Sequence, residues 1–89
     1  MIVKAAVQIQ DFRQNIIWEI PCHRHSDAFY ILKMMGYKRD IDYKELAQGF
    51  LDEKDNFYTR VEAWNEAYKC NQLLIIDYTS KELYSEDLW

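Results

Sequence analysis

The strongest constraint on the fold is an alternation of polar and apolar side chains along residues 2–10 (IVKAAVQIQ). The odd-numbered positions of this segment are all apolar, whereas the even-numbered positions include lysine and glutamine. A period of two is typical of a β-strand with one buried face. Residues 16–20 (IIWEI) form a second run rich in β-forming residues, so the two runs predict a hairpin. We expect Pro21 to end the second strand, because proline has no N–H for the sheet.

A first helix is predicted after this hairpin. Ser26 and Asp27 are both good N-cap residues, and Gly36 stands where a left-handed residue would end a helix. Between these ends lies an apolar stripe with helical spacing, formed by Ala28, Phe29, Ile31, Leu32 and Met35.

The second predicted helix has a clear start signal. Thr59 and Glu62 have the spacing of a capping box, with a hydroxyl at the N-cap and a carboxylate three residues later. The helix is expected to run to about Cys70, with Asn71 as the residue that ends it.

The remaining segments complete a small α+β domain. Residues 37–48 show no clean period and predict a connecting loop with a turn of helix, whereas residues 53–56 predict the turn of a short hairpin. A final strand is expected at 73–78 and an ordered tail at 80–89. The predicted order is β-β-α-β-β-α-β, which gives a single domain over residues 1–89 with a mostly antiparallel sheet packed against two helices.

Composition limits the class of protein. A chain of 89 residues has room for one core, and 49% hydrophobic residues exclude intrinsic disorder. A net charge of −4 argues against binding to extended nucleic acid. No apolar run approaches the ~20 residues of a membrane span, and the first residues do not have the pattern of a signal peptide. Cys22 and Cys70 are interpreted as reduced thiols in a cytosol, although a single bridge between them stays open.

Positive residues stand where two helices are predicted to begin. His23, Arg24 and His25 precede the first helix, and Arg60 is the first residue of the second. Cations are disfavoured at helix N-termini, whereas free N–H groups with an arginine beside them can bind an anion such as phosphate. These residues are therefore candidates for anion binding. The alternative is that they pair with the chain's many carboxylates.

Other chemistry has less support. Cys22 beside His23 and His25 suggests zinc ligands, but no second pair of ligands stands at the usual spacing, so no metal or cofactor is expected. The chain contains no GxSxG, HExxH, P-loop or GxGxxG motif, so we do not expect an enzyme. Phe50 is a candidate for stacking on a nucleobase, and its alternative is an ordinary core residue.

Three separated stretches together resemble a family of small phage-encoded proteins. The residues before the first helix resemble an RHHD signature, the middle of the chain resembles QGF…F-x-x-R-x-EA…A…GQ, and the end resembles LYSEDLW. The matching residues are Arg24, His25 and Asp27, then Gln48, Gly49, Phe50, Phe57, Arg60, Glu62, Ala63, Ala67 and Gln72, and finally Leu83 to Trp89. The family is identified as one that includes the phage anti-Thoeris sponges, which sequester cyclic ADP-ribose-type signals.

The resemblance implies an oligomeric protein that binds a nucleotide signal without cleaving it in the cytosol of a bacterial host. Arg24, His25, Phe50 and Arg60 would then contact the ligand. The sequence departs from the pattern where Ser26 replaces a histidine, Asp55 a glycine and Thr59 an aspartate or asparagine, which bears on the ligand more than on the fold.

Three functions therefore compete. The first is a protein that captures a small phosphorylated nucleotide through His23, Arg24, His25, Phe50 and Arg60. The second is a protein–protein inhibitor of a bacterial defence effector, such as an anti-CRISPR protein. The third is an enzyme that acts on the same messenger with a histidine as acid–base.

Overall fold

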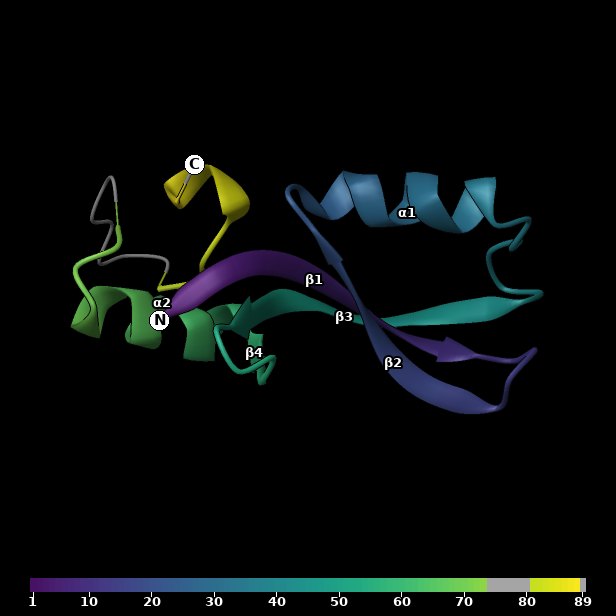
Figure 1. The fold of residues 1–89 in the computed structure, drawn as a ribbon, viewed down its shortest axis with the longest axis horizontal. Coiled ribbons are helices and arrows are strands. Elements are labelled where there is room, and N and C mark those ends of the chain that lie inside the picture. Colours follow the sequence, from purple (N-terminus) through teal and green to yellow (C-terminus); the bar gives the residue numbers. More distant parts are fainter. Residues whose placement is uncertain (74–80, 89) are drawn as a thin grey trace.

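The fold is described from a computed structural model, in which residues 1–73 and 81–88 are described. Two ten-residue helices lie towards opposite ends of an elongated domain that measures 39 × 21 × 20 Å (Figure 1). The elements in chain order are β1 (Ile2–Asp11), β2 (Ile16–Cys22), α1 (His25–Met34), β3 (Tyr43–Asp52), β4 (Phe57–Thr59), α2 (Arg60–Lys69) and the short 3-10 helix η1 (Ser85–Asp87).

The four strands form one antiparallel sheet in the order β2-β1-β3-β4. This arrangement confirms the predicted α+β class and both predicted hairpins. The predicted strand at 73–78 falls almost wholly outside the described residues. No helix among the described residues is long and apolar enough to cross a membrane.

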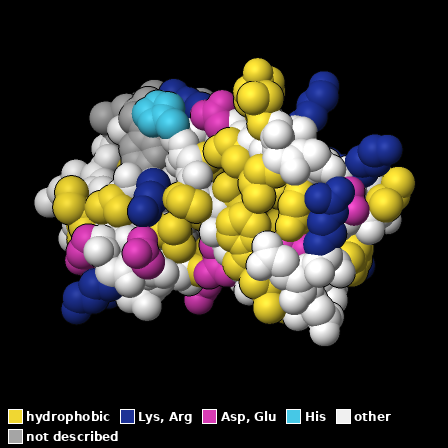
Figure 2. Space-filling view, turned by 45° about the vertical axis from the view of Figure 1, so that its right-hand side comes forward, with side chains coloured by type: hydrophobic (Ala, Val, Ile, Leu, Met, Phe, Trp, Pro, Cys, Tyr) yellow, Lys and Arg dark blue, Asp and Glu magenta, His cyan; other side chains and the backbone are white. Residues whose placement is uncertain are grey.

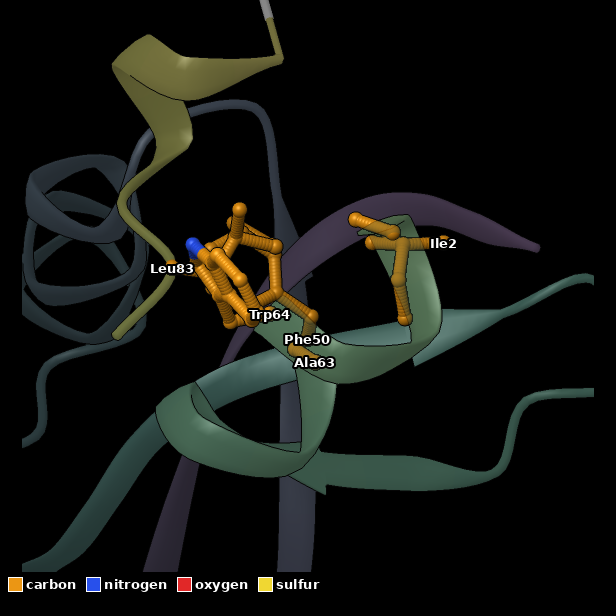
Figure 3. Packing of buried hydrophobic residues seen from close by; sticks show 7 residues of the cluster. Ile2, Phe50, Ala63, Trp64 and Leu83 are labelled. Atoms are coloured by element: carbon orange, nitrogen blue, oxygen red, sulfur yellow. The ribbon is translucent and has the colours of Figure 1, made fainter. Parts of the chain in front are cut away.

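Two hydrophobic clusters share the core, one under each helix. The α2 cluster includes Trp64 and Ala67 packed against Phe50 and Leu83, and Figure 3 shows the Trp64 and Leu83 side chains lying together. The α1 cluster is formed by Val7, Ile9, Ile20, Ala28, Leu32 and Tyr43.

The strand register places both clusters on the same face of the sheet. Residues that lie opposite each other in antiparallel strands project to one face. Ala5 lies opposite Phe50 of the α2 cluster, and two residues along the strand Val7 lies opposite Ile20 of the α1 cluster. Cys22 contacts both clusters. One face of the sheet therefore carries both helices. Both helices begin near the place where the two clusters meet.

The structure corrects the predicted end of the second strand. Pro21 does not stop β2 but lies within it, opposite Ala6. β2 is an edge strand, and an edge strand accommodates proline because the missing N–H can face away from the sheet.

A bulge modifies the predicted alternation in β1. Ala5, Val7 and Ile9 are buried as predicted, but Val3 is exposed and Ile2 is buried instead. The register between β1 and β3 shifts between Ile2 and Lys4, and an irregularity of this kind reverses which side chains face the core.

Residues 37–48 were predicted as a loop, and this prediction is wrong for their second half. β3 begins at Tyr43 and becomes a central strand of the sheet. Its register with β1 moves from Ala47 to Glu45, which leaves Leu46 as an extra residue. The bulge breaks the period of two. This part of the strand also contains the polar residues Lys44, Glu45 and Gln48, so the sequence does not show an apolar strand there.

Helix α1 begins earlier than predicted, with Arg24 at the N-cap. Asp27 occupies the third helical position, where its carboxylate accepts a hydrogen bond from the backbone N–H of Arg24 at 3.2 Å. The predicted end is confirmed, because Gly36 has a φ of +81° and its N–H donates to the carbonyl of Lys33. The apolar stripe is only partly buried, since Ile31 and Met35 stay exposed.

Helix α2 confirms its sequence signals. The hydroxyl of Thr59 accepts a hydrogen bond from the N–H of Glu62 at 3.3 Å, and the Glu62 carboxylate accepts one from the N–H of Thr59 at 3.0 Å. Asn71 ends the helix with a φ of +55°. Ala67 is buried and belongs to the hydrophobic cluster under this helix.

Two buried aspartates organise the turns of the hairpins. Asp52 accepts hydrogen bonds from the N–H groups of Lys54 and Asn56, the amide of Asn56 and the hydroxyl of Tyr58. Burial alone would raise the pKa of Asp52, but these hydrogen bonds outweigh it and hold the pKa well below its usual value. Asp11 has the same balance, with burial opposed by hydrogen bonds from residues Arg13, Gln14, Trp18 and Tyr37.

Replacement of Gly49 by alanine is predicted to destabilise the protein strongly. An added Cβ would overlap the carbonyl oxygen of Tyr58 and the ring of Phe57, so we expect a loss of about 3 kcal/mol in the free energy of unfolding. Gly36→Ala is the matched control, because only its positive φ opposes a side chain in otherwise open space. We expect it to cost about 1 kcal/mol. Urea unfolding of both variants measures the difference, and equal losses would contradict the close approach at Gly49.

Stability is predicted to fall on acidification through Asp11 and Asp52. Because the folded-state pKa of each is depressed, their contribution is fully present above the unfolded pKa of about 3.9 and disappears as the pH falls below it. Asp52→Asn should therefore lower stability at neutral pH and flatten its decline between neutral and acidic pH. Urea unfolding across this range tests the expectation, with the exposed Asp40→Asn as control. An unchanged pH profile for Asp52→Asn would contradict it.

Candidate anion site between the helix N-termini

A hollow of about 420 Å³ lies where α1 and α2 begin. In Figure 1 the two helices run outward from the middle of the domain, α1 to one end and α2 to the other. Both helices therefore direct their N-termini towards the hollow, and the segment that carries η1 closes a third side. The lining residues are Arg24, His25 and Ser26 from the start of α1, Arg60 from α2, Gln48 from β3, and Tyr84 and Ser85 from the C-terminal segment.

The described lining of this hollow makes it a candidate site for an anion. The N-terminus of a helix carries about half a positive charge from its aligned peptide dipoles, and two such ends meet here. Arg24 and Arg60 add full charges, and none of the described residues that line the hollow is acidic. In a chain with a net charge of −4, this is a local concentration of positive charge that a small anion would neutralise.

Arg60 is held in place by neutral groups. Its guanidinium donates to the side-chain oxygen of Gln48 at 2.6 Å and to the carbonyl oxygen of Leu83 at 2.8 Å. The guanidinium carbon also lies 4.6 Å from the centre of the Tyr84 ring, which is a cation–π contact. Among the described residues Arg60 forms no ion pair with a carboxylate, and the groups among them that fix its guanidinium are neutral.

Arg24 approaches the hollow from α1. As the N-cap residue it has an extended backbone, and its guanidinium donates to the hydroxyl of Ser85 at 3.2 Å. Ser85 is itself buried. The two arginines therefore donate hydrogen bonds to the same C-terminal segment from different helices. Arg24 donates to Ser85 and Arg60 donates to Leu83.

His25 is a buried wall of the hollow. Its Nε2 lies 2.8 Å from the carbonyl oxygen of Gly49, so this nitrogen carries a hydrogen and donates it. Its ring meets the edge of Phe50 at a centroid distance of 5.1 Å. These contacts fix the ring against the sheet.

Phe50 does not present a face for stacking in this structure. It is fully buried in the α2 cluster and contacts the His25 ring. In this structure Phe50 is therefore a core residue, which was the alternative interpretation of the sequence. Among the described lining residues, the exposed aromatic side chain is Tyr84, which is 44% accessible. Sequence reasoning placed Tyr84 within the LYSEDLW stretch without giving it a role, because only the fold brings this stretch beside Arg60.

His23 lies outside the site. It is exposed and lines a separate hollow of about 470 Å³ with Val3, Lys4, Pro21 and Cys22. Of the five predicted site residues, the structure brings Arg24, His25 and Arg60 together and places the other two elsewhere.

The thiols and possible metal ligands do not form a reactive site among the described residues. Cys22 and Cys70 are both free. Burial, and secondarily the charge of Asp27, raise the pKa of the Cys22 thiol to about 11, so it stays protonated at neutral pH. No group of three potential metal-ligating side chains occurs in the described ranges.

Comparison with known proteins assigns the chain to a family. A family model described as Phage T4 y16D protein matches residues 1–89, the whole of the chain. Neither the curated proteins nor the solved structures gave a match. The resemblance to small phage-encoded proteins is therefore confirmed at this coarser level, and the chain belongs to the phage T4 y16D protein family.

Proposed function

We propose that this phage protein binds a small phosphorylated nucleotide in the hollow between α1 and α2 and sequesters it without cleavage. The nucleotide would be an immune second messenger of the bacterial host, such as a cyclic ADP-ribose-like molecule or a cyclic oligonucleotide. The protein would then act against host defence in the host cytosol.

The observation that carries the proposal is the meeting of two arginines and two helix N-termini at one hollow without a lining carboxylate among the described residues. Two other arginines of this protein pair with carboxylates, Arg13 with Asp42 and Arg39 with Glu45, each at 3.0 Å. Arg60 instead has amide, carbonyl and aromatic partners. A bound phosphate would supply negative charge at this position through charge-assisted hydrogen bonds.

The dimensions and the aromatic wall support a nucleotide rather than a bare ion. A volume of about 420 Å³ is within the roughly 300–1,000 Å³ of small-molecule sites. Tyr84 offers a ring on which a base can stack, and Gln48 and Ser26 offer polar groups for its edge or for a ribose.

Several features favour capture over catalysis. The Nε2 of His25 is already engaged by the Gly49 carbonyl, and His23 lines a different hollow. The positive groups stabilise a ligand that is already charged, which is what retention of an intact messenger requires. The resemblance to the anti-Thoeris sponges points in the same direction.

We predict that the purified protein binds at least one nucleotide from a panel of cyclic ADP-ribose isomers and cyclic di- and trinucleotides. Arg24→Ala and Arg60→Ala should each weaken binding by about 10- to 100-fold, because a hydrogen bond to a charged group contributes roughly 1.5–3 kcal/mol. Tyr84→Ala should weaken it as well. Isothermal titration calorimetry measures these affinities, and mass spectrometry of ligand released by denaturation should show it unchanged.

Matched controls separate the site from general effects of charge or folding. Arg39→Ala removes an arginine outside the hollow, and Tyr30→Ala removes an exposed tyrosine of α1; both should leave affinity unchanged. Circular dichroism confirms that every variant is folded. No heat with any nucleotide would contradict the proposal, and stoichiometric capture of a host protein would then favour the inhibitor of a defence effector. A chemically altered ligand would instead indicate an enzyme.

A further inference from the structure

A carboxylate behind the hollow contacts the amide that holds Arg60. The side-chain oxygen of Gln48 accepts a hydrogen bond from the Arg60 guanidinium at 2.6 Å, and the amide nitrogen of Gln48 donates to Oε1 of Glu45 at 2.8 Å. Gln48 lines the hollow, whereas Glu45 is not one of the described lining residues. Three side chains are therefore joined by hydrogen bonds that lead from the surface of the sheet to the anion site.

The two neighbours of Gln48 allow its amide one orientation. An ionised carboxylate only accepts hydrogen bonds, and a guanidinium only donates them. If the amide turned over, its NH2 group would face the Arg60 guanidinium and its oxygen would face the Glu45 carboxylate. Both hydrogen bonds would then be lost. Glu45 therefore keeps the oxygen of Gln48 directed at Arg60.

The bulge in β3 is what brings Glu45 and Gln48 to the same face of the sheet. Side chains three residues apart in a regular strand project to opposite faces. Leu46 is the extra residue that changes this pattern, so that Glu45 lies opposite Ile9 and Gln48 lies opposite Val7. Val7 and Ile9 both belong to the α1 cluster and share one face. Bulges that redirect a side chain in this way are common beside functional sites.

A neutral amide separates the carboxylate from the arginine. Glu45 pairs directly with the exposed Arg39, which donates to its other oxygen at 3.0 Å. Arg60 instead meets the uncharged oxygen of Gln48. A carboxylate in the place of that amide would compete with a phosphate for the same guanidinium donors. The arrangement thus orients Arg60 and leaves the negative charge of Glu45 one side chain away.

We infer that Glu45 is a positioning residue, which acts through Gln48 to hold the guanidinium of Arg60 in the hollow. Nη1 of Arg60 donates to the Leu83 carbonyl and Nη2 donates to Gln48, so the guanidinium turns about its Cζ–Nε bond only when both hydrogen bonds break. An arginine that is ordered before a ligand arrives binds it with a smaller loss of entropy. This benefit to a ligand rests on the proposed function, whereas the order of Arg60 does not.

Rotation of the Arg60 guanidinium in the ligand-free protein tests the inference. Exchange between its Nη1 and Nη2 signals in nuclear magnetic resonance measures the rate. Glu45→Ala should accelerate the rotation about 3- to 10-fold, which is the effect of weakening one hydrogen bond. Arg39→Ala is the matched control, because it removes the surface ion pair of Glu45 and leaves the acceptor for Gln48; its rate should equal that of the wild type.

Two double variants show whether Glu45 acts through Gln48. Glu45→Gln combined with Arg39→Ala retains one side-chain oxygen for the Gln48 amide without a competing donor, so the rotation should stay slow. Gln48→Met removes the intermediate group, so a further Glu45→Ala change should add nothing to its rate. Circular dichroism establishes that each variant is folded.

Equal rotation rates in the wild type and Glu45→Ala would overturn the inference. It would also be overturned if Arg39→Ala accelerated the rotation as much as Glu45→Ala, or if Glu45→Ala accelerated it further in the Gln48→Met protein. The surface ion pair or a direct effect of the charge would then be the cause.

Inorganic phosphate separates this inference from the proposed function. Phosphate should shift the Nε–Hε signal of Arg60 in the wild type, and Glu45→Ala should need about 3- to 10-fold more phosphate for the same shift. If phosphate leaves this signal unmoved in the wild type while the rotation rates follow the expected pattern, the anion site is contradicted and the positioning of Arg60 by Glu45 is supported.

Discussion

The contacts of Arg60 join three parts of the chain that are distant in sequence. Its guanidinium donates to Gln48 of β3 and to the carbonyl of Leu83, while its own carbonyl accepts the N–H of Leu83 at 2.9 Å. Tyr84 covers the guanidinium. Leu83 in turn fills the α2 cluster beside Trp64. The position of the C-terminal segment, and with it one wall of the hollow, therefore depends on this arginine.

This arrangement gives an acidic protein a candidate site for an anion. The sheet places both helices on one face with their first residues together, so two positive helix ends and two arginines act on the same small volume. The net charge of −4 disfavours a long polyanion but does not oppose a ligand small enough to lie within the hollow. A ligand within the hollow would lie a few ångströms from these positive groups. This distance is shorter than the Debye length of about 8 Å, so dissolved salt would screen the attraction only in part.

Local signals in the sequence predicted the helices well. Thr59 with Glu62 defined the start of α2, and Gly36 and Asn71 defined two helix ends, because capping depends on residues a few positions apart. The hydrophobic face of α1 was less predictable. Figure 2 shows hydrophobic side chains gathered in a band down the middle of the face that it presents. On α1 itself, Tyr30, Ile31 and Met34 are exposed.

Features that depend on contacts between distant segments were not predictable in this way. The first half of β3 was not predicted because the bulge at Leu46 interrupts the alternation of side chains. This part of the strand is held by its pairing with β1, which the local sequence does not indicate. Arg24, His25 and Arg60 were found by their place at helix starts, but Tyr84 was not, because nothing near it in the sequence indicates that it covers Arg60. Phe50 was open to two interpretations that only its burial separates.

The central claim is that Arg24 and Arg60 together hold the phosphate groups of a nucleotide. Nuclear magnetic resonance of the arginine Nε–Hε groups tests it most directly, with Arg39 as an internal reference outside the hollow. When a nucleotide that binds in calorimetry is added, the account predicts that the signals of Arg24 and Arg60 shift together at the same ligand concentration while that of Arg39 stays in place. Saturation of the protein with both signals unmoved would contradict it.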